Sequence, residues 1–328
     1  MVAGNRLSGR NQKDVSMMGQ PLLSINIPIY NRSSYLDRML ARFLEDKDLF
    51  EDKVALFISD NCSKEALSDV VQKYTDQGLR VFYDRNETNI GGDGNIVKCF
   101  KHGGGEYVWV LGSDDVPCRG VVREVVRILD SGKKYGLLHL DDKLEDTAFR
   151  EYESADALFE AMHVWITFIS RNIVSGQYIA RVPVEQYQST SFAQIPVYLT
   201  AGYGASLNAI WTCDAFEAGC DSAANGGYNV FRVFCDNLLS LLRQFVAEGY
   251  MRKESYFRIK KAVYKNFTVH YILKFLVKRR ENNFDTSGGW RIVFRNYGGH
   301  LYSYWYFFAG ILHSMKYKLS RLVHKEGV

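Results

Sequence analysis

Short apolar runs alternate with amphipathic segments over the first 140 residues, and this alternation constrains the fold more than any other feature. The apolar runs are rich in β-branched residues and predict strands at 22–28, 54–58, 80–83, 107–111 and 136–140. The segments between them show helical spacing at 34–44, 65–74, 95–101 and 121–129. Strands and helices that alternate at this length predict an α/β fold with a mostly parallel, Rossmann-like sheet and helices on both faces.

The regular alternation weakens beyond residue 140. Between 155 and 215 the pattern predicts a helix at 156–169 and a strand at 175–180, separated by polar turns. From residue 228 onward amphipathic helical stretches dominate, at 230–248 and 256–278, with a loop at 282–289. We therefore expect a flexible leader over 1–20, an α/β domain over 21–225, and a helical C-terminal region over 226–328.

The formal net charge of +4 is the sum of an acidic N-terminal part and a basic C-terminal part of the chain. Residues 251–328 contain 16 basic and 4 acidic residues, a net charge of +12, whereas the first 250 residues carry −8. The same C-terminal residues hold 17 of the 46 aromatic side chains. A basic, aromatic-rich segment suits an anionic membrane surface or nucleic acid.

Composition excludes several classes of protein. A hydrophobic fraction of 47% with only 5 Pro excludes a globally disordered chain. The 6 Cys form no C-x-x-C pair, which argues against a zinc ribbon, a thioredoxin-type site and a secreted disulfide scaffold. The first 20 residues lack the apolar core of a signal peptide. These features predict a cytoplasmic protein with reduced thiols.

Polar clusters follow three of the predicted strands, at residues 30–32, 60–61 and 113–115. Ligands of an open parallel sheet collect outside the carboxyl ends of its strands, where loops converge and helix N-termini present free N–H groups. Paired carboxylates such as Asp114 and Asp115 suit a hard divalent cation that completes its shell with substrate phosphates. The pattern therefore predicts a phosphorylated substrate.

Several well-known motifs are missing. No Gly-Lys is followed by Ser or Thr, which excludes a Walker A loop, and neither Gly-rich stretch has the third glycine of a dinucleotide fingerprint. The sequence also lacks H-E-x-x-H and G-x-S-x-G. Nicotinamide, zinc-protease and α/β-hydrolase chemistries are therefore disfavoured.

Four motifs, in order, resemble those of family 2 glycosyltransferases of the GT-A fold. They are LSINIPIYNR at 23–32, FISDNCS at 57–63, NETNIGGDGN at 86–95 and GSDD at 112–115. Within that family the chain is similar to the abequosyltransferase type, enzymes that build bacterial O-antigen or capsule repeat units. The resemblance implies a GT-A domain over 21–225, with a nucleotide-binding half at 21–130 and an acceptor half at 131–225.

The resemblance also implies an activity and a place in the cell. A sugar would pass, with inversion, from a nucleotide-diphosphate sugar to a hydroxyl of a lipid-linked glycan acceptor. Such an enzyme works in the cytoplasm, peripherally at the inner face of the cell membrane. This makes an anionic membrane a better partner for the basic C-terminus than nucleic acid.

The resemblance assigns site residues individually. The nucleotide sugar is expected to contact Pro28, Tyr30, Asn31, Asp60, Asp93, Ser113 and Asp114. Asp60 would accept hydrogen bonds from the base and Asp114 would face the ribose. Asp115 would hold Mg²⁺ or Mn²⁺ bridging the two phosphates, where a cation stabilises the departing diphosphate as a Lewis acid.

The catalytic base departs from the family pattern. Many members place an acidic Glu-Asp pair in the acceptor half, but the corresponding stretch at 191–194 contains no acidic residue. Asp141, or its neighbour Asp142, follows the predicted strand at 136–140 and is expected at the same sheet edge as the other site residues. Glu185 and Asp214 remain open alternatives.

The apolar run at 301–312 is followed by several Lys and Arg residues. It is shorter than the roughly 20 apolar residues needed to span a bilayer, and it predicts an interfacial helix. A core helix or a helix at a homo-oligomer contact is the alternative. Two other functions stay open for the whole chain: a sugar nucleotidyltransferase, and a non-catalytic binding or scaffold protein that kept the fold.

Overall fold

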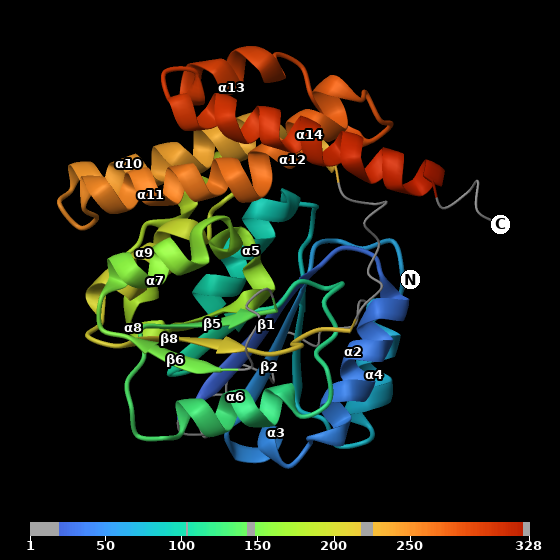
Figure 1. Ribbon diagram of the computed structural model, residues 1–328. Helices are drawn as coiled ribbons and strands as arrows, with labels where there is room; N and C mark the ends of the chain where they lie inside the picture. Colours follow the sequence, from blue (N-terminus) through green and yellow to red (C-terminus); the bar gives the residue numbers. More distant parts are fainter. Residues whose placement is uncertain (1–19, 103, 143–147, 218–225, 324–328) are drawn as a thin grey trace. The chain divides into compact units, whose positions relative to one another are not determined.

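The computed structural model describes residues 20–102, 104–142, 148–217 and 226–323 (Figure 1). These residues divide into two compact units. The first takes its residues from 20–155, 166–189 and 193–217, and the second from 156–165, 190–192 and 226–323. The helical second unit therefore includes two short segments from the range predicted as the acceptor half. The predicted leader lies outside the described residues, except for Gln20.

The first unit is built on an eight-stranded sheet in the order β3-β2-β1-β4-β7-β5-β8-β6. Its strands are β1 Leu23–Ile29, β2 Val54–Asp60, β3 Val81–Arg85, β4 Tyr107–Val110, β5 Leu137–Asp141, β6 Phe149–Tyr152, β7 Asn172–Ser175 and β8 Asn208–Thr212. Parallel pairs join β1 to β2 and β4, β2 to β3, and β5 to β8, whereas β7 and β6 pair antiparallel with their neighbours. The predicted mostly parallel α/β sheet is confirmed.

The central strand β1 is buried almost throughout. Its apolar side chains fill the core, and its polar ones are satisfied inside it: Asn26 Nδ2 donates to the carbonyl of Cys99 at 2.6 Å, and Ser24 Oγ donates to Asn26 Oδ1 at 2.8 Å. A strand covered by helices on both faces reads as a continuous apolar run, as this one does.

Helices cover the sheet of the first unit (Figure 1). They are α2 Ser33–Glu45, α3 Leu49–Asp52, α4 Leu67–Thr75, α5 Gly91–His102, α6 Val121–Leu129, α8 Gly176–Ile179 and α9 Ile195–Gly204, with a 3₁₀ turn, η2, at Ile169–Arg171. Helix α6 shows why they pack: Val122, Val125, Val126 and Leu129 recur at helical spacing and are buried.

Three predicted elements are wrong. The helix expected over 156–169 ends as α7 Ala155–Met162, because His163 has a positive φ of 37° and the chain continues in 3₁₀ turns (η1 His163–Thr167). The strand expected at 175–180 occupies 172–175 instead, and α8 begins at Gly176. The loop expected at 282–289 contains the short strand β10 Asn283–Asp285, which pairs with β9 Gly226–Asn229. In addition, the sequence pattern predicted neither β6 nor β8.

The second unit is helical. Besides α7 it contains η4 Arg232–Asn237, α10 Leu238–Ala247, α11 Lys253–Val263, η5 Tyr264–Thr268, α12 Val269–Tyr271, η6 Ile272–Val277, α13 Gly289–Tyr297 and α14 Leu301–Val323. The short helix η3 Val184–Thr190 belongs to the first unit except for its last residue. Stacked rings form part of its core, with centroids 4.1 Å apart for Phe234–Phe267 and 4.4 Å apart for Phe267–Tyr271. Among the described residues no helix combines the length and the apolar character required to cross a membrane.

Candidate functional site

The loop after β1 is held in a left-handed turn. Asn31 and Arg32 have φ values of 57° and 68°, a region that few residues other than Gly and Asn adopt readily. The turn is fastened to the loop after β2, because the Asn31 N–H donates to Ser63 Oγ at 2.7 Å and the Lys64 N–H donates to Asn31 Oδ1 at 2.9 Å. The Asn31 side chain therefore shapes this edge of the sheet, while Tyr30 beside it is 40% exposed and Pro28 is partly buried.

Glu65 closes the N-terminus of α2. Its carboxylate accepts the N–H of Ser33 at 2.6 Å and the N–H of Arg32 at 3.1 Å. Hydrogen bonds from Ser33 hold the pKa of Glu65 below its usual value. This role was not predicted, because the carboxylate caps a helix that begins about 30 residues earlier in the chain rather than its own.

Asp60 is completely buried at the end of β2. Its Oδ1 accepts the N–H of Ser63 at 2.8 Å, and its Oδ2 accepts the Tyr83 hydroxyl at 2.6 Å and Arg85 Nη1 at 2.9 Å. Both oxygens are thus engaged by β3 and by the loop after β2. A nucleobase that hydrogen-bonds to Asp60 has to share or replace one of these donors.

Hydrogen bonds of asparagine side chains hold the Gly-rich stretch after β3 against the end of β2. Asn61 Nδ2 donates to Asn89 Oδ1 at 2.9 Å, and Asn61 Oδ1 accepts the N–H of Ile90 at 2.9 Å. The buried Asn95 donates to the carbonyl of Ser59 at 2.8 Å. These bonds explain Asn89 and Asn95 of the 86–95 motif as residues that hold the loop in place.

Asp93 lies in the first turn of α5, directly after that loop, and is partly exposed. The N-terminus of a helix attracts anions, and an acidic side chain there is favourable by itself. The position brings Asp93 to the same edge of the sheet as Asp60, because α5 begins after the carboxyl end of β3.

Arg32 joins the loop after β1 to the loop after β4. Its Nη1 lies 3.2 Å from Asp114 Oδ2 and 3.2 Å from Ser113 Oγ. The guanidinium and the Asp114 carboxylate both keep part of their surface exposed. This places a positive charge beside the predicted pair of carboxylates.

Ser170 orients the carboxylate of Asp115, which is partly buried like Asp114. Ser170 Oγ donates to Asp115 Oδ2 at 2.6 Å and accepts the N–H of Gly112 at 2.8 Å. Burial raises the pKa of Asp115, and the neighbouring charge of Asp114 adds to that rise, while the bond from Ser170 and the charge of Arg171 oppose it. A positive charge placed at this carboxylate would favour its ionised form.

The two carboxylates and the Ser170 hydroxyl converge on Gly112. A Cβ added there would lie 3.0 Å from Asp115 Oδ2, 3.0 Å from Ser170 Oγ and 3.4 Å from Asp114 Oδ1. Glycine therefore leaves a small oxygen-lined space, and oxygen donors are the ligands that Mg²⁺ and Mn²⁺ prefer. No group of three His, Cys, Asp or Glu able to hold a metal occurs in the described ranges, so two carboxylates would leave the remaining positions to phosphate oxygens or water.

Arg171 is a site residue that the sequence analysis missed. Its Nη2 lies 2.5 Å from Asp142 Oδ2, its Nη1 lies 3.8 Å from Asp141 Oδ1, and its side chain is 13% exposed. It precedes β7, which runs antiparallel between β4 and β5, so its start lies beside the end of β5. A guanidinium next to Asp115, Asp141 and Asp142 makes this edge suitable for an anionic ligand.

His139 is buried in β5, two residues before Asp141 at this edge. Its Nδ1 is 2.9 Å from Asn172 Oδ1. Burial lowers the pKa of His139 to about 4. The ring is therefore neutral at ordinary pH and supports the fold rather than carrying charge to the site.

The four candidate bases occupy different places. Asp141 is buried at the end of β5 and Asp142 is exposed beside it; Asp214 is exposed after β8, at the same edge because β5 and β8 are parallel. Glu185 instead forms an ion pair with Lys101, at the C-terminal end of α5. That end of α5 leads into the start of β4, so the structure does not bring Glu185 to the edge that carries Asp115.

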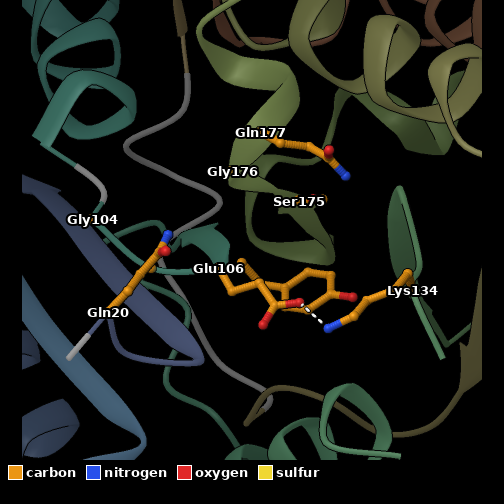
Figure 2. Close-up of a pocket in the computed structure, with 9 residues that line it drawn as sticks. Gln20, Gly104, Glu106, Lys134, Ser175, Gly176 and Gln177 are labelled. Atoms are coloured by element: carbon orange, nitrogen blue, oxygen red, sulfur yellow. Dashed lines mark hydrogen bonds and ion pairs between the residues drawn. The ribbon is translucent and has the colours of Figure 1, made fainter. Parts of the chain in front are cut away.

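A separate pocket of about 540 Å³ opens at the opposite edge of the sheet (Figure 2). Its lining includes Gln20, Glu106, Lys134, Ser175 and Gln177, around the starts of β1 and β4. Glu106 and Lys134 form an ion pair of 2.6 Å across it. None of the predicted site residues lines this pocket, and its two charges neutralise each other.

Comparison with known proteins gives one family. The family model described as glycosyl transferase family 2 matches residues 24–179. Abequosyltransferase RfbV of Salmonella typhimurium is 30% identical over 111 residues, which are 34% of this chain and 33% of that protein. The matched segment spans about a third to two fifths of the length of the curated relatives.

Two solved structures share the fold at low sequence identity. Residues 1–349 of TarS from S. aureus, in complex with UDP-GlcNAc, give a TM-score of 0.55 at 15% identity, covering 76% of this chain and 72% of that one. The mannosyltransferase PcManGT from Pyrobaculum calidifontis, in complex with GDP-Man and Mn²⁺, gives 0.52 at 12% identity, covering 90% and 88%. Residues 24–179, which include the strands β2 to β7 and the residues around Gly112, therefore resemble glycosyl transferase family 2, and the first unit has the GT-A fold.

Proposed function

We propose that this protein transfers a sugar from a nucleotide-diphosphate sugar to a hydroxyl group of a glycan acceptor, with inversion at the anomeric carbon. The observation that carries the proposal is the convergence of Asp114, Asp115 and Ser170 on Gly112, at the carboxyl edge of a family 2 domain. Ligands of open α/β sheets bind at this edge.

The donor is proposed to lie along the loops after β1, β2, β3 and β4. Pro28, Tyr30 and Asn31 supply one wall, and the half-exposed ring of Tyr30 offers a flat surface for a base. Asp60 stands behind this wall, and Asp93 stands at the N-terminus of α5. Two guanidinium groups, of Arg32 and Arg171, flank the place proposed for the diphosphate.

A divalent cation, Mg²⁺ or Mn²⁺, is proposed to bind at Asp115 with Asp114 beside it. When bound, it would supply Lewis-acid stabilisation of the leaving diphosphate. The residues of the chain have distinct tasks: Ser170 orients the Asp115 carboxylate, and Arg32 holds Asp114 and Ser113 together. Ser113 and Asp114 are thereby kept where the ribose is proposed to lie.

Asp141 is proposed as the base that takes the proton from the acceptor hydroxyl. It reaches the same edge as Asp115 from the end of β5, and Arg171 lies between the two loops. Asp142 is the second candidate, since it is more exposed and closer to the same guanidinium. Removing each carboxylate separately distinguishes them.

The acceptor is proposed to be a lipid-linked glycan in the synthesis of a bacterial surface polysaccharide, O-antigen or capsule. Support comes from the similarity to an abequosyltransferase and from the basic, aromatic C-terminal residues. In this proposal residues 21–130 hold the donor, residues 131–225 hold the acceptor, and residues 226–328 approach the inner face of the cell membrane from the cytoplasm.

The test measures nucleoside diphosphate release. The protein is incubated with Mn²⁺, a membrane lipid extract as acceptor source, and a panel of UDP-, GDP-, CDP- and dTDP-sugars. We expect free nucleoside diphosphate with one nucleotide class, and we expect Asp115→Asn to abolish it because a neutral amide is a poor ligand for a hard cation. The matched control is Asp76→Asn, an exposed aspartate after the C-terminal end of α4.

Three outcomes contradict parts of the proposal. Turnover that is unchanged in Asp115→Asn removes the metal assignment. Pyrophosphate release from a nucleoside triphosphate indicates a sugar nucleotidyltransferase instead. Donor binding without any turnover, across the panel, indicates a binding or scaffold protein with the same fold.

A further inference from the structure

Helix α14 exposes four large apolar side chains to solvent. Leu301, Trp305, Phe308 and Leu312 are 89%, 72%, 59% and 60% exposed. Their spacing of four, three and four residues puts them on one face of the helix. A helix on the surface of a water-soluble domain normally shows the reverse arrangement.

The opposite face of α14 carries two small residues, Ser303 and Gly310, where it packs most closely. Ser303 is buried, and a Cβ added to Gly310 would lie 2.8 Å from Leu273 Cδ1 and 3.0 Å from Val269 Cγ1. The helix backbone therefore packs closely on α12 and η6 at this point. Rotating α14 to hide its large side chains would force them into a contact that has room only for glycine.

Helix α13 extends the same exposed surface. Trp290 and Phe294 are one turn apart and are 51% and 69% exposed. Between α13 and α14 lies an apolar groove of about 190 Å³, with Trp290, Phe294 and Phe308 among its lining residues. We call the six side chains Trp290, Phe294, Leu301, Trp305, Phe308 and Leu312 the α13–α14 face; a surface of this kind marks an interaction site.

The positive charge of the residues around this face indicates which kind of partner binds there. Residues 251–328 carry a net charge of +12. Exposed basic side chains lie on the neighbouring elements. They are Arg291 on α13, Lys261, whose ammonium group lies 5.9 Å from the ring centroid of Tyr302 on α14, and Lys265, whose ammonium group lies 5.9 Å from that of Tyr306. A second copy of the chain would bring two positive surfaces together, whereas an anionic bilayer attracts them.

We propose that the α13–α14 face docks on the surface of an anionic lipid bilayer, with Trp290 and Trp305 at headgroup level and a lipid chain in the groove. Trp at the interface and Lys or Arg facing anionic headgroups are typical of such contacts. The inference rests on the proposed function, since a lipid-linked acceptor is presented at a bilayer surface, and it names the residues that make the contact.

The experiment uses vesicles of phosphatidylcholine and phosphatidylglycerol whose chains carry bromine, which quenches tryptophan fluorescence on contact. We expect the full chain to sediment with these vesicles and its fluorescence to fall. The double variant Trp305→Gln/Phe308→Gln should bind roughly ten- to a hundredfold more weakly, because two large apolar side chains no longer leave water. Both positions are exposed, so the variant should keep its circular dichroism spectrum.

A matched control and two further measurements make the result decisive. Tyr250→Gln changes an aromatic residue that is 58% exposed in the same unit but lies on neither α13 nor α14, and it should bind as the wild type does. Binding of the double variant equal to that of the wild type, or no quenching, overturns the proposal. A wild-type dimer that the double variant converts to monomer, without vesicle binding, shows that a second copy covers the face and also overturns it.

Failure of the docking proposal differs from failure of the proposed function. Vesicle binding requires neither donor nor acceptor. Docking that persists in Asp115→Asn, together with an inactive wild type, counts against the sugar transfer alone. Sugar transfer without vesicle binding counts against the docking alone.

Discussion

Replacing Ser170 by alanine tests the geometry around Gly112 most directly. The Ser170 hydroxyl joins two groups, because it accepts the Gly112 N–H at 2.8 Å and donates to Asp115 Oδ2 at 2.6 Å. Ser170→Ala removes both bonds and leaves every proposed ligand in place. The variant therefore separates the orientation of Asp115 from its presence.

The size of the effect follows from the two bonds. A hydrogen bond to a charged acceptor contributes about 1.5–3 kcal/mol and a neutral one about 1 kcal/mol, and water can replace part of each at a partly buried site, so we expect a loss of about 2 kcal/mol in the free energy of unfolding. The pKa of Asp115, already raised by burial, should rise further without the bond from Ser170. Losing a residue that orients a ligand weakens metal binding by roughly ten- to a hundredfold.

The assay has two parts. Urea unfolding gives the change in stability, and electron paramagnetic resonance of Mn²⁺ in the presence of the nucleoside diphosphate released by the active protein gives the metal affinity. Thr212→Val is the matched control, because the buried Thr212 hydroxyl makes no hydrogen bond among the described residues. Its loss should change both quantities little.

Two results would refute the reasoning. Wild-type Mn²⁺ affinity in Ser170→Ala, with the expected drop in stability, means that Asp115 does not hold the cation. Unchanged stability means that the hydroxyl does not make these two bonds in solution.

Two further predictions concern stability. Asp60→Asn should lower the free energy of unfolding, measured with urea, by about 3 kcal/mol, because an amide cannot accept hydrogen bonds from Ser63, Tyr83 and Arg85 together. A loss of stability no larger than that of the exposed Asp76→Asn would contradict this prediction. Burial lowers the pKa of His139 from its usual 6.5 to about 4. At pH values between these two, the unfolded chain is protonated at His139 and the folded chain is not, so the free energy of unfolding decreases as the pH falls below 6.5. Between about pH 7.5 and about pH 5 this amounts to about 2 kcal/mol, which His139→Gln should not show; equal pH slopes in urea unfolding would disprove it.

The sequence predicted five of the eight strands of the sheet and most of the candidate site at their carboxyl ends. Apolar runs ending in polar clusters located Asn31, Asp60, Asp114 and Asp115 at strand ends, and the structure places all four at the carboxyl edge. These positions follow from local patterns, because a strand and the turn that ends it lie next to each other in the chain.

The contacts between these loops were beyond local patterns. Ser170 and Arg171 reach the edge because β7 inserts antiparallel between β4 and β5, a pairing set by residues more than 30 positions away. The same applies to Glu65, which caps a helix that begins earlier in the chain, and to Asp60 Oδ2, which accepts from Tyr83 and Arg85 of β3. Nothing in the spacing of these residues distinguished them from ordinary polar turns.

The C-terminal run shows the division most clearly. Its composition alone indicated an apolar, aromatic segment followed by basic residues, too short to span a bilayer. Only the tertiary structure showed which side of α14 faces outward, because Gly310 and Ser303 permit close packing on one side and leave Trp305 and Phe308 on the other. Sequence determines the elements and the chemistry they carry, whereas the rotation of a helix and the partner of a strand depend on packing between segments distant in the chain.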